Sequence, residues 1–290
     1  MYSRFLNTLQ HLPRLGFGLG FKETYGNDLL HLADDTEWSH QVDWLEIISE
    51  NYFKPSHHSL QQLQALLEVG FPIIPHGVNL SLGSVTPLNT DYLKHLEALF
   101  TLTEPLWFSD HLCFSSYGGH HANDLLPLPI NEESAEQCIK NILYVKERFD
   151  IPFLVEHVST YIEMCEPGWN EASWIRYIVQ EADCGLLLDL NNVFVNTQNH
   201  GGDAYQYIHA LPLEHVVEIH MAGHLKTKDL LIDTHGEPIC DEVFSLFSYA
   251  LPRCKNLKGV LLERDSHLPN FEALLAELAQ LRILHLESCT

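Results

Sequence analysis

The feature that most restricts the fold of this 290-residue chain is a regular alternation of short apolar runs with longer segments of helical periodicity. The helical segments have apolar residues at i, i+3, i+4 and i+7, as in helices that pack one face against a sheet. The short runs are mostly apolar without alternation, which is typical of strands covered on both faces. The predicted strands are residues 15–21, 42–48, 71–75, 106–109, 153–156, 185–190, 216–220 and 259–262.

Eight strand–helix units in a chain of this length fit an α/β fold of the (β/α)8 barrel type, also called a TIM barrel. We therefore expect a single barrel domain over residues 1–290. A doubly wound open sheet would give the same alternation of units, so the alternation alone does not separate the two folds. The position of the polar residues does, because a barrel collects its chemistry at the C-terminal ends of its strands.

Seven consecutive predicted strands end in histidine or acidic residues, often with asparagine beside them. In chain order these residues are Glu46, Glu50 and Asn51; His76; Asp110 and His111; Glu156 and His157; Asp189, Asn191 and Asn192; Glu218, His220 and His224, followed by Asp233 and His235 in a loop; and Glu263 and Asp265. One such residue alone is more often a cap or a turn residue than a ligand. Seven strand ends that converge on one barrel mouth instead predict a shared site.

The chemistry of these side chains favours a site that holds more than one metal ion. Many carboxylates in one dry mouth would repel each other strongly unless cations were present. Neutral imidazoles among them are typical of transition-metal sites. Asp233 and His235 are two residues apart, on the same side of an extended loop. The donor set is oxygen and nitrogen without thiolate, which suits Fe, Mn or Zn.

Composition excludes several other classes of protein. The formal net charge of −23 argues against binding along a nucleic-acid backbone, which depends on Lys and Arg. Seven cysteines without a CxxC pair indicate reduced thiols, mostly buried, and not a disulfide framework. No apolar run reaches the length of a membrane span, and the N-terminus lacks the pattern of a signal peptide. We expect a cytoplasmic protein that binds neither membranes nor nucleic acid.

The strings that carry these residues resemble a known family. They are GFGLGFK, WLEIISENYF, PHGVNLSLGS, SDHL, VEHVSTY, LLLDLNNV with NHG, EIHMAGH, LIDTHGEP and LLERDSHLPNFEALLAEL. In order and spacing they are similar to the multinuclear non-haem iron-dependent oxidative enzymes (MNIO), the barrel proteins of methanobactin-type biosynthesis. The resemblance runs from about Leu15 to Leu278. The ligand order is also similar to that of endonuclease IV and the xylose isomerase-like barrels.

The resemblance implies a (β/α)8 barrel that holds two or three irons and uses O2 as co-substrate. The implied substrate is a ribosomally made precursor peptide, modified at cysteine or another residue and often presented by a peptide-recognition partner protein. Transferred position by position, the pattern implies that Asp189, His220 and Glu263 act in catalysis. It implies metal ligands at His76, His111, Glu156, Asp189, Asn192, His220, Asp233, His235 and Glu263, with Asn192 as a weak ligand or a substrate contact.

Further polar residues of the mouth are expected to support the ligands from behind or to contact the substrate. They are Glu50, Asn51, Asp110, His200 and His224. His200 lies in a glycine-flanked stretch and is expected to line the entrance of the site.

Three other functions remain open at this stage. A metal-assisted hydrolase of the endonuclease IV type would use metals to activate water and hold a phosphate, although the net charge opposes a DNA substrate. A sugar isomerase would use a metal pair to shift a hydride or a proton. A binding module would use its metal only to order loops.

Overall fold

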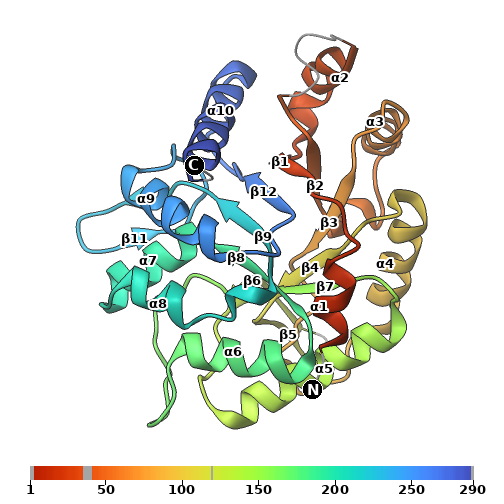
Figure 1. Cartoon of the computed structure of the whole chain (residues 1–290). Coiled ribbons are helices and arrows are strands. Elements are labelled where there is room, and N and C mark those ends of the chain that lie inside the picture. The colour runs from red at the N-terminus through yellow and green to blue at the C-terminus, as the bar shows by residue number, and fades with distance from the viewer. Residues whose placement is uncertain (1–2, 35–40, 119, 289–290) are drawn as a thin grey trace.

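The computed structural model describes residues 3–34, 41–118 and 120–288. Eight parallel strands close into a barrel in the order β1-β12-β9-β8-β7-β4-β3-β2, so chain order and spatial order agree around the ring (Figure 1). The barrel strands are β1 Gly16–Gly20, β2 Trp44–Ile48, β3 Ile73–Gly77, β4 Phe108–His111, β7 Phe153–Glu156, β8 Gly185–Asp189, β9 Val216–Met221 and β12 Gly259–Leu262. The predicted barrel is therefore confirmed, and every predicted strand overlaps an observed one.

Helices surround the barrel, and short 3-10 turns lie between elements. The α-helices are α1 Arg4–Leu9, α2 Gly26–Asp34, α3 His57–Glu68, α4 Thr90–Thr103, α5 Glu132–Arg148, α6 Glu171–Ala182, α7 Leu190–His200, α8 Ala204–Ala210, α9 Asp241–Ala250 and α10 Phe271–Ser288. The 3-10 turns are η1 Glu23–Tyr25, η2 Ser49–Tyr52, η3 Leu213–His215 and η4 Leu251–Arg253. Among the described residues, no helix combines the length and the apolar character that crossing a bilayer requires.

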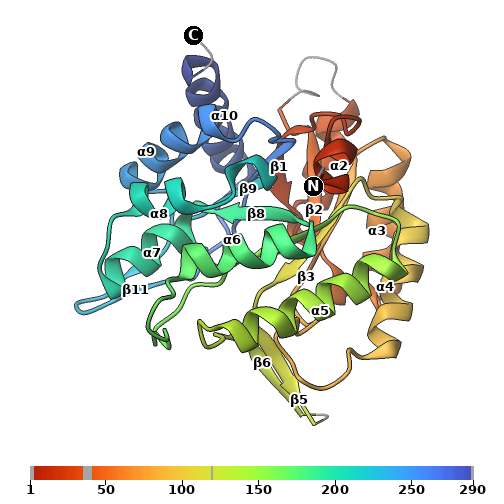
Figure 2. The same cartoon turned by 60° about the horizontal axis from the view of Figure 1, so that its bottom comes forward.

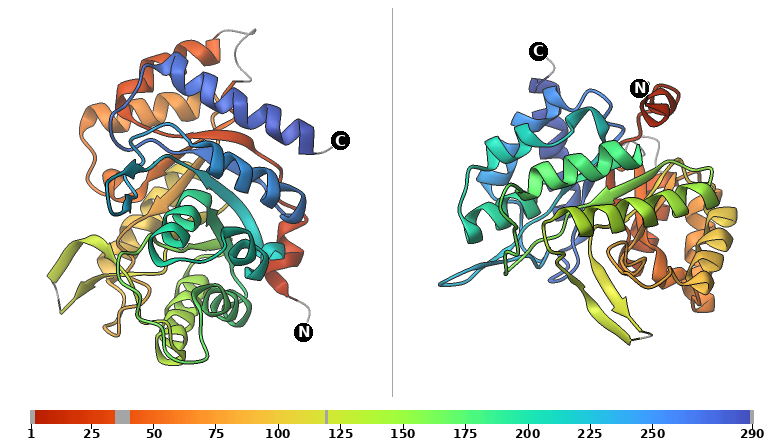
Figure 3. Two further views of the ribbon diagram at one scale, coloured as in Figure 1. Left: turned by 90° about the vertical axis from the view of Figure 1, so that its left-hand side faces the viewer. Right: turned by 90° about the horizontal axis from the view of Figure 1, so that it is seen from below.

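Two antiparallel hairpins extend the loops beyond the barrel, and the sequence pattern did not predict them. The pair β5 Phe114–Tyr117 and β6 His120–Leu126 follows β4, and β10 Leu225–Lys226 pairs with β11 Leu231–Ile232 after β9. Figures 2 and 3 show the β5–β6 hairpin projecting well away from the barrel. Both hairpins leave from C-terminal ends of barrel strands, so they border the predicted site.

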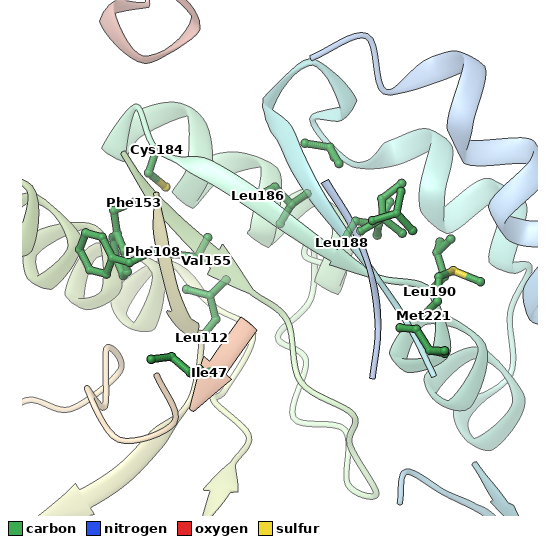
Figure 4. Close-up of a cluster of buried hydrophobic side chains, with 14 of the residues drawn as sticks. Ile47, Phe108, Leu112, Phe153, Val155, Cys184, Leu186, Leu188, Leu190 and Met221 are labelled. Atoms are coloured by element: carbon green, nitrogen blue, oxygen red, sulfur yellow. The ribbon is translucent and has the colours of Figure 1, made fainter. Parts of the chain in front are cut away.

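The larger core lies between the barrel and its helices (Figure 4). Strand side chains alternate between two environments, as the period of two in a strand requires. In β7, Phe153 and Val155 pack outward in this core, whereas Leu154 packs inside the barrel. The same alternation continued to the strand end carries Glu156 to the inside of the barrel. The burial of Phe153, Leu154 and Val155 thus determines that the side chain of Glu156 points into the barrel.

The N-terminal end of the barrel is filled by a second apolar cluster. Its members include Phe5 and Leu9 of α1, with Trp44 and Trp107 from the starts of two strands. The two indole rings lie edge to face, 6.1 Å apart. Trp44 requires glycine on the adjacent strand, because a Cβ at Gly18 would lie only 2.5 Å from the Trp44 ring. We therefore interpret Gly18 of the string GFGLG as a requirement of packing against Trp44.

The described cysteines are free thiols, as the sequence predicted. They are Cys113, Cys138, Cys165, Cys184, Cys240 and Cys254, and four of them are buried. Cys289 lies outside the described residues.

Candidate metal centre

The strand ends bring histidine and carboxylate side chains together at one end of the barrel. The register of the sheet places His111 opposite Glu156 and Asp189 opposite His220 on neighbouring strands. His76 is the second-last residue of β3, the next strand in the ring, and Glu263 directly follows β12. All of these side chains are buried. The expected convergence of these residues on one mouth is thus observed.

Glu156 is the carboxylate that the nearby imidazoles share. One oxygen, Oε2, lies 3.0 Å from His111 Nε2 and 3.4 Å from His76 Nε2. The other oxygen, Oε1, lies 3.8 Å from His220 Nδ1. Three rings from three strands therefore meet one carboxylate.

Glu263 has the same arrangement on the other side of the mouth. Its Oε2 lies 3.2 Å from His220 Nδ1 and 3.2 Å from His235 Nδ1. His235 Nε2 in turn lies 2.7 Å from Asp233 Oδ1 and 3.9 Å from Asp189 Oδ2. His220 therefore links the Glu156 side of the mouth to the Glu263 side.

The two carboxylate oxygens of Asp189 have different surroundings. Its Oδ1 accepts a hydrogen bond of 2.7 Å from Asn192 N and so caps the first turn of α7. Its Oδ2 is buried without a hydrogen-bond partner among the described residues. Asn192 is held by a 3.1 Å bond from its Nδ2 to the carbonyl of His157, which leaves its buried Oδ1 without a partner.

Hydrogen bonds behind the histidines fix the orientation of their rings. His111 Nδ1 donates to the carbonyl of Gly77 at 3.0 Å, and His76 Nδ1 is 2.7 Å from Ser109 Oγ. Each bond turns the opposite nitrogen, Nε2, toward Glu156. Metal-binding histidines in proteins are usually held in this way by a partner on the other nitrogen.

The electrostatics of the mouth indicate that its carboxylates carry more negative charge than its imidazoles compensate. Burial alone would raise the pKa of Glu156, but His111 and His220 lower it to about 2. Burial would lower the pKa of His111, which Glu156 raises instead to about 9. Burial raises the pKa of Asp189 to about 8, although His235 opposes this shift. The imidazoles therefore neutralise only part of the carboxylates, and bound cations would neutralise the rest.

The residues present fit a metal cluster. Four groups of three side chains have ligand atoms close enough to share an ion; they are His76–His111–Glu156, Glu156–Asp189–His220, Glu46–His220–Glu263 and Asp189–His235–Glu263. The groups overlap, which is the arrangement expected for neighbouring ions with common ligands. Buried oxygen atoms that have no hydrogen-bond partner among the described residues, such as Asp189 Oδ2 and Asn192 Oδ1, point to the same conclusion.

A cavity of about 450 Å³ leads to these residues. Its floor includes His76, His111, Glu156 and Glu263, and its walls come from the end of β6 and from the loop after β7. On that loop Tyr161 and Ile162 are exposed. The centre is therefore buried in the barrel and open to solutes through its mouth.

Two of the residues predicted to support the ligands form a buried acidic network. Glu50 Oε1 accepts hydrogen bonds from Val78 N and from the hydroxyl of Tyr92, at 2.9 and 2.5 Å. The same hydroxyl lies 3.3 Å from Asp110 Oδ2, and burial raises the pKa of Asp110 to about 7. Asn51, predicted together with them, is exposed on η2.

The other two residues predicted to support the ligands, His224 and His200, lie in different parts of the molecule. His224 Nδ1 donates to Asn191 Oδ1 at 2.8 Å, and Asn191 Nδ2 donates to Asp233 Oδ1 at 2.8 Å, so His224 reaches the outer ligand pair through one intermediate. His200 lies away from the cluster, because its Nε2 donates to the carbonyl of Thr160 at 2.7 Å. It lines a second cavity instead.

Sequence reasoning did not assign roles to two glutamates inside the barrel. Glu46 Oε2 and Glu218 Oε1 each lie 3.3 Å from His220 Nε2, and Glu46 belongs to one of the four ligand groups. Trp107 Nε1 donates to Glu218 Oε2 at 2.7 Å. The sequence could have indicated them, because each is a carboxylate within an otherwise apolar strand. Burying a carboxylate without a partner is costly. His157, also left without a role, is buried and has no hydrogen bond to either ring nitrogen among the described residues.

The fold and its strand-end residues define the class of protein, a (β/α)8 barrel of the xylose isomerase-like type. A D-psicose 3-epimerase from Clostridium cellulolyticum H10 superposes with a TM-score of 0.59 at 11% identity, covering 94% of this chain and 98% of that one. An IolI protein with a bound zinc atom superposes with a TM-score of 0.55 at 11% identity, covering 94% and 97%. At such low identity these structures inform the fold alone.

Sequence comparison gives the family. The model of the RiPP precursor modification enzyme MbnB/TglH/ChrH matches residues 16–285, and the chain belongs to this family, the MNIO proteins. A UPF0276 protein of Anaeromyxobacter sp. strain Fw109-5 is 38% identical over 263 residues, which covers 91% of this chain and 90% of that protein. A UPF0276 protein of Acaryochloris marina is 39% identical over 269 residues, covering 91% and 93%.

Proposed function

We propose that the protein uses a cluster of two or three irons and O2 to oxidise a ribosomally made precursor peptide, at a cysteine residue. The observation that carries the proposal is the set of four overlapping, buried ligand groups at the barrel mouth. It occurs in a chain that belongs to a family of RiPP precursor modification enzymes.

The ligand assignment follows the geometry of the mouth. His76 and His111 would hold one ion together with Glu156, and Asp233 and His235 would hold the outermost one. The central residues, which would be shared between ions and take part in catalysis, are Glu156, Asp189, His220 and Glu263. Asn192 offers its Oδ1 as a further ligand or as a contact to substrate. These nine residues exceed what one ion of about six-fold coordination can use.

The residues of the chain perform three tasks in this proposal. The carboxylate of Glu156 faces three imidazoles and that of Glu263 faces two, and both would hold the cations together. The bonds to Ser109 and Gly77 keep the imidazoles in place. The depth of the cavity excludes bulk water and orients the peptide, where positioning contributes most to the rate. When bound, iron would bind the cysteine sulfur, activate O2 beside it and supply electrons.

We also propose that a separate recognition protein presents the peptide. Oppositely charged surfaces accelerate association, so a chain with a net charge of −23 favours basic segments in its partners. The peptide alone is then expected to bind weakly, and more strongly when its leader segment or the partner protein is present.

The metal part of the proposal is tested by anaerobic purification after iron-replete expression. Elemental analysis should give at least two metals per chain, and Mössbauer spectroscopy should assign them to iron. One metal or less per chain would refute a multinuclear centre. Zinc or manganese alone, in protein that is active on a peptide, would refute iron.

The reaction is tested by co-expression with a short open reading frame encoded beside the gene, together with any partner gene there. Mass spectrometry should detect an oxidised peptide under aerobic conditions and an unmodified one without O2. An unmodified peptide from iron-loaded enzyme with every partner supplied contradicts the proposal. Cleavage of abasic DNA or epimerisation of a ketose by the same preparation would favour the hydrolase or the isomerase instead.

A further inference from the structure

A second cavity of about 450 Å³ adjoins the one above the metal centre. Pro127, Thr160 and Ile162 line both cavities, so the two are neighbours across the loop that follows β7. The second cavity is bounded by this loop, by the first turn of α6, by the end of α7 and by α8. It takes no part in the reaction proposed above.

The polar centre of this cavity is the carboxylate of Glu171. Its Oε2 accepts a hydrogen bond of 2.8 Å from the hydroxyl of Tyr207 and a longer one of 3.5 Å from Asn196 Nδ2. Its other oxygen, Oε1, accepts neither bond. An ionised carboxylate in a mostly enclosed site normally has a cationic partner.

The residues that line the cavity supply no cationic partner. They include the acidic residues Glu163 and Asp203 in addition to Glu171, but neither lysine nor arginine. Their one histidine, His200, is bonded to Thr160 through Nε2.

The groups that face Glu171 leave its charge only partly compensated. Burial, with a smaller contribution from the nearby carboxylate of Glu163, raises the pKa of Glu171 to about 7. Tyr207, Asn196 and His200 oppose the shift but do not cancel it. Cys165 is the remaining titratable neighbour, and Glu171 helps to raise its pKa. A cation bound here would neutralise the charge of Glu171 that these groups leave uncompensated.

The walls of the cavity fit the stem of a long cationic side chain. Leu128, Ile130, Ala172 and Ala210 line it with apolar surface, and Glu171 is the half-buried carboxylate among them. Lysine and arginine place such an apolar stem along apolar surface while the charged head meets a carboxylate.

We propose that this cavity is a specificity subsite that binds a Lys or Arg side chain of the peptide substrate, with its charged head on Glu171. The proposal rests on the proposed function in taking a peptide as the occupant. A cationic residue in this subsite would hold the peptide across the loop at residues 160–162, with a neighbouring segment over the metal centre. The subsite would thus select which peptides, and which position in them, reach the metals.

The test measures binding of capped amino acids to the metal-loaded protein by calorimetry or NMR at pH 8. The probes are N-acetyl-arginine methylamide and N-acetyl-lysine methylamide, with N-acetyl-norleucine methylamide as the uncharged control. The cationic probes should bind at least tenfold more tightly than the norleucine probe. Glu171→Gln should remove this preference, whereas Glu133→Gln, at an exposed position outside the cavity, should keep it within about twofold.

A second measurement needs no variant. Affinity of the unsubstituted protein for the cationic probes should rise between pH 6 and pH 8, as Glu171 ionises. Equal binding of cationic and uncharged probes, or a preference that survives Glu171→Gln, would overturn the subsite. Putrescine binding as tightly as the capped residues would also overturn it, because the cavity would then hold a free amine and not a peptide side chain.

These outcomes do not depend on whether the proposed function is correct. Probe binding requires no O2 and no turnover, so a protein that fails to oxidise any peptide would still show the preference if the subsite exists. Conversely, loss of the subsite would leave metal content unchanged, because Glu171 belongs to none of the candidate ligand groups.

Discussion

Replacing Glu156 with glutamine tests the arrangement of the metal centre most directly. The amide has nearly the same shape as the carboxylate but lacks its charge. Glu156 belongs to two of the four ligand groups, His76–His111–Glu156 and Glu156–Asp189–His220. Glu263 belongs to the other two. Each single variant should therefore damage one side of the mouth and leave the ligands of the other side in place.

The size of the effect follows from these shared ligands. Loss of one shared carboxylate should remove about one metal per chain in either Glu156→Gln or Glu263→Gln. The double variant should retain almost none. In the metal-free protein, Glu156→Gln also removes the buried partner 3.0 Å from His111. Breaking such a pair costs roughly 3–5 kcal/mol, which in a chain of this length corresponds to a fall in Tm of about 5–8 °C.

Elemental analysis of anaerobically purified protein checks the metal content. Thermal unfolding with and without chelator checks the change in stability. Glu133→Gln, an exposed position at the start of α5, is the matched control and should behave as the unsubstituted protein. A full metal complement in both single variants would refute the assignment of these carboxylates. Complete loss in either one would instead mean that all ions bind as a single unit.

Three further outcomes are expected. His200→Ala should keep its full metal content by elemental analysis, because its ring bonds to Thr160 and not to the cluster; metal loss equal to that of Glu156→Gln would contradict this. The raised pKa of Glu171, about 7, favours the folded state fully below pH 4.5, and this contribution is lost as pH rises through 7. Since its side chain is partly open to solvent, we expect urea denaturation to give about 2 kcal/mol more loss between pH 5 and pH 8 in the unsubstituted protein than in Glu171→Gln. Gly18→Ala should lower stability by roughly 1–3 kcal/mol in the same assay because of the Trp44 ring, and an unchanged midpoint would show that the ring can move.

Much of the fold and of the proposed site was predictable because side chains alternate between two faces along each strand. A parallel strand buried on both faces is read from its apolar run, and the residue that ends the run must face the barrel interior or the helices. In β7 and β8, Leu154 and Leu187 face inward, so Glu156 and Asp189, two residues later, do so too. The apolar pattern therefore locates the strand and also directs its last side chain.

The residues that the sequence analysis named without assigning a role lie where this reasoning does not apply. Glu46 faces inward within β2, two residues after Trp44, and not at a strand end. In β9 the register shifts against β8 between Leu186 and Leu187, which is typical of a bulge and brings both Val217 and Glu218 inward. The second cavity depends on how a loop and three helices pack, and no local pattern encodes such an arrangement.

The apolar closure of the barrel by α1 has a consequence for the order of events in the cell. Phe5, Leu9 and the two tryptophans close the N-terminal end of the barrel. If the protein works as proposed above, ions, O2 and peptide would then all enter and leave through the opposite end. A peptide lodged in the mouth would trap whatever lies beneath it. Metallation must then precede peptide binding, and a chelator should strip the free enzyme faster than the peptide-bound one. Enzyme that meets its peptide before its metals would be held in a dead-end complex.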